Sequence, residues 1–276
     1  MSLLLSHDQL ESSTDAVIDW LDHFGANYTR VIGADLLGTD SWSLTLGQPD
    51  PVLQGLPDPK EVEVVWFRRW QRGSLVGTNQ FVSDQTTDKL DRHLKREFGK
   101  LSQYLFSLYQ DAYWLGDYKS ADINKLQVLQ VATEVGFTIP PTCISNSKEA
   151  LASFLQQHGR AIVKPIGDTD MFREEGADES SMLTMYTEEL TPEVLEQAPS
   201  HFFPTLCQAR VDKLLEYRVF YLEGELYPMS IFSQSHTQTS TDFRKYDQAH
   251  PNRRGLASFD EHTTAQLRQL MQQLQL

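Results

Sequence analysis

A short apolar run that ends in a lysine and a proline, at residues 160–165, places the strongest constraint on the fold. Ala161, Ile162 and Val163 predict a buried β-strand, because a brief apolar run with β-branched members suits such a strand. Lys164 ends the strand, and the proline after it cannot continue the pairing. A lysine at the end of a buried strand is costly unless an anion meets it, so an anion site is one interpretation of this run. The alternative is an ammonium group that reaches solvent.

The next stretch, residues 166–181, is polar and has no apolar period, so it is predicted to be a mobile loop. A lysine at the root of such a loop is a common arrangement for holding a nucleotide phosphate and then covering it. Residues 182–186 are predicted to return as the partner strand of 160–165.

The start of the chain alternates strand, helix and strand. Residues 3–5 and 27–32 suit strands, and residues 12–15 between them supply capping side chains for a helix that Gly25 ends. A further strand is expected over 62–66. This order predicts a parallel α/β layer.

One long amphipathic helix is predicted over 88–114, because apolar residues recur there at three- and four-residue spacing. Its basic face is expected to be solvated, with docking of an acidic peptide as the alternative. Residues 47–60, before it, are predicted to form a loop. Arg68 and Arg69 are expected either to bind an anion or to form solvated or salt-bridged pairs.

Residues 121–200 are predicted to form a small α+β domain. Asp122 is expected to cap a helix that Gly136 ends. A strand follows at 142–145, and Ser147 is expected to cap a second helix before the buried strand described above.

Residues 201–276 are predicted to form a third region, which begins with a strand at 206–211. A hairpin follows, with its turn at Glu223-Gly224. The last element is an amphipathic helix capped by Ser258 or Asp260.

Composition limits the class of protein. The 276 residues carry a net charge of −14 with 40% apolar residues, which indicates a globular chain and argues against general nucleic-acid binding. No membrane span or signal peptide is recognised, so a cytoplasmic protein is expected. Cys143 and Cys207 imply no disulfide framework. The histidines show no metal-ligand spacing, and His236, His250 and His262 are expected at the surface.

Several motifs occur in one fixed order, and together they carry more weight than any one of them. They are Asn124-Lys125 before Ile139-Pro140, Ile162-Val-Lys-Pro165 before the predicted loop, Gln208-Ala-Arg-Val211 before Glu216-Tyr-Arg218, and Asp242-Phe-Arg244. This set resembles the ATP-grasp ligases, whose nucleotide lies between two α+β lobes. Further runs along the whole chain look like the graspetide synthetases, above all the "grasp-with-spasm" ATP-grasp peptide maturases, which are similar to microviridin ligases. These runs lie at 11–15, 66–70, 124–126, 136–140 and 231–234.

The resemblance implies an α/β and α+β fold. Residues 1–120 would be a Rossmann-like pre-ATP-grasp domain that includes the helix 88–114. Residues 121–200 would be the central lid domain, and 201–276 an incomplete C-terminal ATP-grasp domain.

The resemblance also implies a nucleotide site. Lys125 and Lys164 would contact the phosphates of ATP, where cations offset the charge that builds during phosphoryl transfer. The hinge at Gln208, Ala209 and Val211 would read the adenine edge through its backbone. An acidic residue often follows that glutamine in the family, and Ala209 stands there instead.

Three further residues would complete the site that the resemblance implies. Glu216 would meet the ribose, and Arg218 would lie near the terminal phosphates. Arg244 would stabilise the acyl phosphate and the carboxylate that is being activated. The alternative for Glu216 and Arg218 is an exposed cross-strand ion pair of little energetic weight.

The activity that the resemblance implies is ATP-dependent activation of Asp or Glu side chains in a ribosomally made precursor peptide. Thr, Ser or Lys side chains of the same peptide would then attack, which closes a macrocycle. The expected partners are a precursor peptide with its leader segment and a second copy of the chain, without nucleic acid or membrane. Two alternatives stay open: an ATP-grasp ligase that adds amino acids to a peptide or protein, and a non-catalytic peptide-binding module.

The sequence departs from the family pattern at its end. In ATP-grasp enzymes the last helix is followed by a strand with an aspartate and a strand with a Glu-x-Asn pattern, which bind Mg²⁺. This sequence ends at Leu276, before such a segment. We therefore expect the magnesium ligands beyond Leu276, and we expect this polypeptide alone to be inactive.

Overall fold

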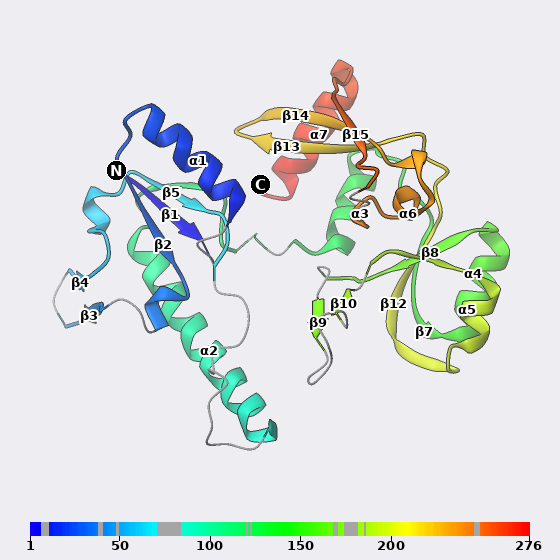
Figure 1. The fold of residues 1–276 in the computed structure, drawn as a ribbon, viewed down its shortest axis with the longest axis horizontal. Coiled ribbons are helices and arrows are strands. Elements are labelled where there is room, and N and C mark those ends of the chain that lie inside the picture. The colour runs from blue at the N-terminus through cyan, green and yellow to red at the C-terminus, as the bar shows by residue number, and fades with distance from the viewer. Residues whose placement is uncertain are drawn as a thin grey trace. The chain divides into compact units, whose positions relative to one another are not determined.

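The computed structural model describes residues 1–6, 11–37, 41–47, 50–70, 84–119, 121, 123–167, 171–173, 182–184, 186–245 and 249–276. The chain folds into two compact units, Met1–Ala121 and Asp122–Leu276 (Figure 1). Within these described ranges, no helix is both long and apolar enough to cross a membrane.

A four-stranded parallel sheet lies in the N-terminal unit, with the strand order β2-β1-β5-β6. Leu3, Leu5 and Val65 from its central strands pack against Phe106 and Tyr109. The predicted parallel α/β layer is therefore confirmed. The strands are β1 (Ser2–Ser6), β2 (Tyr28–Ile32), β5 (Val64–Phe67) and β6 (Tyr113–Leu115).

The helix α1 (Ser12–His23) connects β1 to β2, and its cap differs from the prediction. Glu11 is the N-cap, because its carboxylate accepts hydrogen bonds from the Thr14 backbone N–H at 2.9 Å and from the Thr14 hydroxyl at 2.6 Å. The predicted capping residues 12–15 lie inside the helix instead. Arg68 Nη2 lies 3.2 Å from the Glu11 carboxylate, so Arg68 takes the salt-bridged alternative.

The helix α2 (Asp84–Leu108) is the predicted long helix, and its apolar stripe contributes the buried Phe98 and Leu105. The predicted end at 114 is wrong. The segment from Tyr113 to Leu115 forms β6, in register with β5, because aromatic side chains suit a half-buried sheet position better than a further helical turn.

The predicted loop at 47–60 also contains regular structure. β4 (Val52–Gln54) pairs antiparallel with β3 (Ser43–Thr45), and a 3₁₀ helix (Pro59–Glu61) follows. The prediction of an irregular loop is wrong at these positions, because Leu53 packs against the apolar core of the unit.

The C-terminal unit contains an antiparallel sheet with the strand order β11-β8-β12-β7. The predicted buried strand 160–165 is confirmed as β8, with Ala161 fully buried. Leu151, Phe154 and Leu195 from two helices pack on Ala161 and Cys207. The elements are β7 (Thr142–Ser147), α4 (Lys148–His158), β8 (Ala161–Lys164), β11 (Glu188–Leu190), α5 (Pro192–Gln197) and β12 (His201–Ala209), and both cysteines, Cys143 and Cys207, are free thiols.

The partner of β8 differs from the prediction. Residues 182–184 form β10 (Met182–Thr184), which pairs with β9 (Met171–Arg173) rather than with β8. β8 instead pairs with β11 on one side and β12 on the other. Leu190 and Leu206 give these two strands the buried apolar side chains that β8 needs. The remainder of the predicted mobile loop, 168–170 and 174–181, lies outside the described residues.

The helix α3 (Lys125–Glu134) begins at Asn124, whose side chain accepts a hydrogen bond from the Leu126 N–H at 2.9 Å. The predicted cap, Asp122, lies outside the described residues, and the cap position belongs to Asn124. Ser147 caps α4 as predicted, by accepting from the Ala150 N–H.

The predicted hairpin is confirmed by β13 (Glu216–Leu222) and β14 (Glu225–Phe232), which β15 (Arg253–Leu256) extends to three strands. Its turn uses positive φ at Glu223 (48°) and Gly224 (86°), the geometry of a tight two-residue hairpin. Asp260 caps α7 (Glu261–Gln273). The division between 121–200 and 201–276 stays a prediction. β12, which begins at residue 201, pairs with strands from before it.

We predict that Leu206→Ala lowers the free energy of unfolding of the C-terminal unit by about 2–5 kcal/mol, because Leu206 is fully buried between β7 and β8. Phe203→Ala on the same strand is the matched control, since Phe203 is 85% exposed. All five tryptophans lie in the N-terminal unit, so tryptophan fluorescence follows that unit alone.

In urea unfolding, Leu206→Ala should therefore lower the urea concentration at which the circular dichroism signal of the C-terminal unit is lost. The urea concentration at the midpoint of the fluorescence transition should not change. Equal effects of the two substitutions on the dichroism transition would contradict this packing account.

Candidate functional site

Lys164 is held at the end of β8 by a relay of polar side chains. Its ammonium donates to Gln208 Oε1 at 2.9 Å, and Gln208 Nε2 donates to Thr142 Oγ1 at 2.8 Å. The Thr142 hydroxyl donates in turn to the Pro140 carbonyl at 2.8 Å. Gln208 is buried, so its amide has two fixed partners in the sheet. The relay fixes Lys164 through a neutral acceptor, and no carboxylate of the described residues pairs with its ammonium.

Lys125, in the first turn of α3, reaches the chain that follows β8. Its ammonium donates to the Gly167 carbonyl and, at 3.4 Å, to the Pro165 carbonyl. The cap at Asn124 sets where the helix begins and so where Lys125 projects. The structure thus brings two predicted phosphate ligands, far apart in sequence, to the same strand end.

The charges on three predicted site residues act on one another. The pKa of Lys164 is lowered by burial, by the positive charge of Lys125 and by the positive charge of Arg244. Each of these effects disfavours the charged ammonium. A bound anion would counteract the effects of the Lys125 and Arg244 charges on Lys164. Its negative charge balances the positive charges of all three side chains. The arrangement is therefore suited to a polyanion such as a nucleotide phosphate chain.

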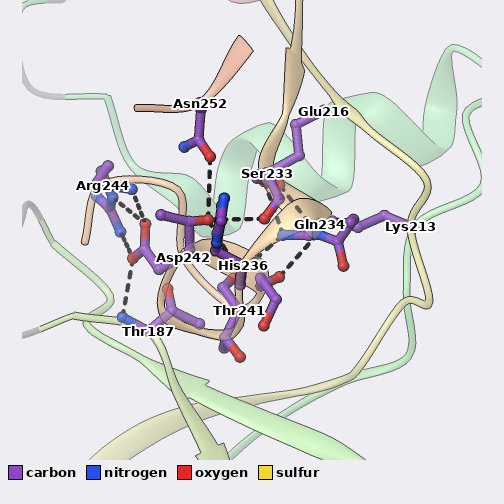
Figure 2. A network of polar contacts seen from close by, with 12 residues as sticks. Thr187, Lys213, Glu216, Ser233, Gln234, His236, Thr241, Asp242, Arg244 and Asn252 are labelled. Atoms are coloured by element: carbon purple, nitrogen blue, oxygen red, sulfur yellow. Dashed lines mark hydrogen bonds and ion pairs between the residues drawn. The ribbon is translucent and has the colours of Figure 1, made fainter. Parts of the chain in front are cut away.

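Arg244 is fixed by the carboxylate of Asp242 (Figure 2). Arg244 Nε and Nη2 donate to the two oxygens of Asp242 at 2.9 and 2.6 Å, and the Arg244 backbone N–H donates at 3.0 Å. Asp242 also accepts from the backbone N–H of Thr187 at 3.2 Å. Asp242 therefore joins the guanidinium of Arg244 to the segment that leads into β11.

Asp242 is a site residue to which the sequence analysis gave no role. It belongs to the quoted Asp-Phe-Arg motif, but only the structure shows its carboxylate between Arg244 and Thr187. Burial alone would raise the pKa of Asp242, yet the Arg244 and Thr187 hydrogen bonds and the Arg244 charge lower it to about 2. Next to it, Lys245 pairs with Glu188 of β11 at 2.5 Å.

Glu216 lies in a second polar cluster, also drawn in Figure 2. Its carboxylate accepts from Ser233 Oγ at 2.5 Å and pairs with Lys213 at 3.0 Å. Gln234 Nε2 donates to Ser233 Oγ at 3.1 Å. Glu216 therefore forms its ion pair with Lys213. The alternative prediction, an ion pair between Glu216 and Arg218, is wrong.

Arg218 is exposed on β13, opposite Met229 of β14. Among the residues that the structure describes, no carboxylate pairs with it. At the predicted hinge, the Ala209 N–H donates to the Pro141 carbonyl at 2.9 Å. Val211 is 54% exposed in the link between β12 and β13. The Ala209 donor is thus engaged within the sheet, whereas Val211 is accessible.

A second basic surface lies on α2, where Lys89, Arg92 and Arg96 line a cavity of ≈ 540 Å³. These three side chains are exposed, which agrees with the expected solvated face. An exposed ammonium or guanidinium loses little by staying in water. Lys164 is half-buried beside other cations, so it gains more from an anion, and we take the β8 end as the candidate site.

The described ranges contain no group of three or more His, Cys, Asp or Glu side chains placed to hold a metal ion. His236 and His250 stack with ring centroids 4.8 Å apart.

No family model matches the sequence, and no curated protein matches it. Solved structures do match over the whole chain. The Chryseobacterium gregarium RiPP-associated ATP-grasp ligase, in complex with ADP and a leader and core peptide, is 20% identical, with a TM-score of 0.74 over 100% of this chain and 82% of that one.

Two further solved structures match this chain over its whole length. The macrocyclase MdnC from Microcystis aeruginosa, bound with precursor peptide MdnA, is 21% identical, with a TM-score of 0.74 over 100% of this chain and 84% of that one. The ATP-grasp ligase PsnB, complexed with minimal precursor, Mg and ADP, is 13% identical, with a TM-score of 0.67 over 100% of this chain and 81% of that one. The chain therefore has the ATP-grasp fold, as its resemblance predicted.

We predict that Asp242→Asn lowers the free energy of unfolding at neutral pH by about 2 kcal/mol, since the pKa of Asp242 falls from 3.8 to about 2 on folding. A carboxyl group whose pKa is lowered by folding stabilises the fold at every pH above the pKa that it has in the unfolded chain. The wild type should therefore lose this advantage as the pH falls from about 4 to about 2.

Urea unfolding at a series of pH values measures the difference. Asp212→Asn is the control, because the ion pair of Asp212 with Arg160 is exposed and contributes little to stability. A difference between wild type and Asp242→Asn that does not change with pH would contradict the assignment.

Proposed function

We propose that the protein is an ATP-dependent carboxylate ligase that activates Asp or Glu side chains of a ribosomally made peptide and cross-links them to Thr, Ser or Lys side chains. The observation that carries this proposal is the gathering of Lys125, Lys164 and Arg244, in which burial and then the charges of the other two cations lower the pKa of Lys164. The ATP-grasp fold supports the proposal, because the structures that share it include ligases solved with ADP and precursor peptides.

The residues present fit the phosphates of ATP. A half-buried ammonium beside two further cations is unfavourable alone and becomes favourable with a polyanion. Bound ATP would supply the phosphoryl group that turns a peptide carboxylate into an acyl phosphate. Lys164 and Lys125 would hold the phosphates, and the Gln208–Thr142 relay keeps Lys164 aimed at them.

The hinge and Glu216 would hold the nucleoside. In this proposal the backbone of residues 208–211 lies along the adenine, with the accessible Val211 as its contact, and Glu216 meets the ribose. The Ser233 hydroxyl and Lys213 keep the Glu216 carboxylate in one orientation.

Two arginines would act during phosphoryl transfer, Arg244 on the carboxylate that is activated and Arg218 on the terminal phosphate. Arg244, held in a fixed plane by Asp242, would bind the anionic acceptor and reduce its charge repulsion with the phosphates. Arg218 has no carboxylate partner among the described residues, so it is available for the terminal phosphate. The hydroxyl or amine of the peptide would then attack the acyl carbon, which breaks its bond to the phosphate and releases inorganic phosphate and a proton, so no protein nucleophile is needed.

The partners follow from the same comparison. A precursor peptide with a leader segment is proposed as the substrate, and Mg²⁺ is proposed with ATP, because related structures carry these groups. A cytoplasmic homodimer stays part of the proposal.

The first test is nucleotide binding by isothermal titration calorimetry with ADP. Lys164→Met and Lys125→Met should each weaken ADP binding by roughly tenfold to a hundredfold, because a hydrogen bond between charged groups contributes on the order of 1.5–3 kcal/mol. Lys60→Met is the control, since Lys60 pairs with Asp50 in an exposed position. Undetectable ADP binding by the wild type, or an equal effect of all three substitutions, would contradict the proposal.

The second test addresses the reaction itself. A synthetic peptide rich in Asp and Glu is incubated with ATP, Mg²⁺ and hydroxylamine, which traps acyl phosphates as hydroxamates. We expect ATP-dependent hydroxamate that Arg244→Gln reduces at least about a hundredfold, as loss of one charge-stabilising group commonly does. Hydroxamate formation that does not require ATP would rule out the proposed chemistry.

A further inference from the structure

Two cysteines that are far apart in the sequence are direct neighbours in the C-terminal unit. Cys143 of β7 and Cys207 of β12 are paired in the antiparallel ladder, and the two strands lie side by side in Figure 1. Paired residues point to the same face of a sheet. Both side chains accordingly contact one apolar cluster, which includes Leu151 and Phe154 of α4. Both are free thiols, and the proposed reaction uses neither of them.

The register places this pair within the range of a disulfide. The Ala209 N–H donates to the Pro141 carbonyl, and bonding alternates along the ladder, so Cys207 and Cys143 form a hydrogen-bonded pair. The Cα atoms of such a pair lie about 5.5 Å apart, a separation that disulfides commonly bridge. Their Cβ atoms lie near about 5.5 Å, whereas a disulfide needs roughly 3.5–4.5 Å. Closing the bond therefore draws the two strands together by about 1 Å.

The two thiols differ in their access to solvent. Cys143 is partly exposed, whereas Cys207 is fully buried. Burial and the neighbouring Cys143 thiol raise the pKa of Cys207 to about 11, so Cys207 is protonated at neutral pH. An oxidant from solvent therefore meets Cys143 first, and the buried Cys207 can reach only the sulfur beside it. This order favours a bond between the two cysteines over separate modification of each.

The polar relay of the candidate site is the adjacent pair in the same ladder. Gln208 follows Cys207, and Thr142 precedes Cys143, so the relay lies on the opposite face of the same two strands. Gln208 also accepts from Lys164 at 2.9 Å. The predicted hinge, residues 208–211, begins directly after Cys207. A contraction at the cysteine pair therefore displaces the relay and the hinge together.

We propose that Cys143 and Cys207 form a reversible disulfide that weakens nucleotide binding. The bond draws β7 towards β12 beside Gln208, and it moves the backbone of 208–211 out of the position that suits the adenine. A disulfide that has to pull its strands together is strained and is reduced more easily, so the change is reversible. The nucleotide as the ligand that responds rests on the proposed function above.

The oxidant in this proposal is the disulfide of a small thiol. The Cys143 thiolate attacks one sulfur of that disulfide, whose S–S bond breaks and releases a first small thiolate, which takes up a proton. Cys207 then gives up its proton and attacks the Cys143 sulfur, which releases the second small thiol. Two protein thiols are oxidised to one disulfide, and the small disulfide is reduced to two thiols.

The test treats the folded protein with hydroxyethyl disulfide, which is small and uncharged. Mass spectrometry of an unreduced digest should show the Cys143 peptide linked to the Cys207 peptide. Isothermal titration calorimetry should then show ADP binding weakened at least roughly fivefold, the loss expected when about one hydrogen bond is displaced. Dithiothreitol should restore both the free thiols and the original ADP affinity.

Cys143→Ser and Cys207→Ala are the matched variants. Both should bind ADP like the reduced wild type, and neither should lose affinity on treatment, because Cys207→Ala leaves only a mixed disulfide at Cys143. The proposal is overturned if no linked peptides form in the folded protein, if the linked protein binds ADP as tightly as before, or if treated Cys207→Ala weakens as much as the wild type.

The reduced protein separates this proposal from the proposed function. If reduced wild type binds ADP and oxidation does not change the affinity, the switch is wrong and the ligase proposal remains. If reduced wild type binds no ADP, the ligase proposal fails and the regulatory role falls with it, whereas the linked peptides still establish the disulfide.

Discussion

The half-buried ammonium of Lys164 is the constraint on which the rest of the site depends. β8 is buried because it lies between β11 and β12 in the sheet. As the last residue of β8, Lys164 is therefore partly shielded from water. The nearest fixed partner of the ammonium is the neutral amide oxygen of Gln208 rather than a carboxylate. Lys125 and Arg244 add positive charge, which lowers the pKa of Lys164 further. The arrangement costs stability without an anion and favours binding when one is present.

The polar links around Asp242 explain how distant segments meet at this site. Asp242 orients Arg244 and also accepts from the Thr187 backbone, while Lys245 pairs with Glu188. Thr187 leads into β11, and β11 pairs with β8, which ends at Lys164. The segment that carries Arg244 is thus connected through one neighbouring strand to the strand that carries Lys164. A buried carboxylate with a pKa of about 2 keeps this connection charged at every physiological pH.

Much of this fold could be predicted from local patterns. The β8 run, the hairpin turn at Glu223-Gly224 and the cap at Asp260 depend on residues close in sequence, and the structure contains all three. The errors have physical reasons. The segment from Tyr113 to Leu115 leaves the helical pattern because the edge of a sheet is available to it. Which strand pairs with β8 depends on contacts between distant segments. The sequence of a three-residue strand is too short to determine that pairing. The role of Asp242 depends on Thr187, which no local pattern links to it.

A crystal structure of the protein with ADP tests the central claim most directly. The account predicts that the diphosphate lies within hydrogen-bond distance of Lys164 and Lys125, and that Lys164 exchanges Gln208 for a phosphate oxygen. The guanidinium of Arg244 should keep its contact with Asp242. A diphosphate bound to the basic face of α2, or one that leaves the Lys164–Gln208 hydrogen bond intact without contact to either lysine, would contradict the account.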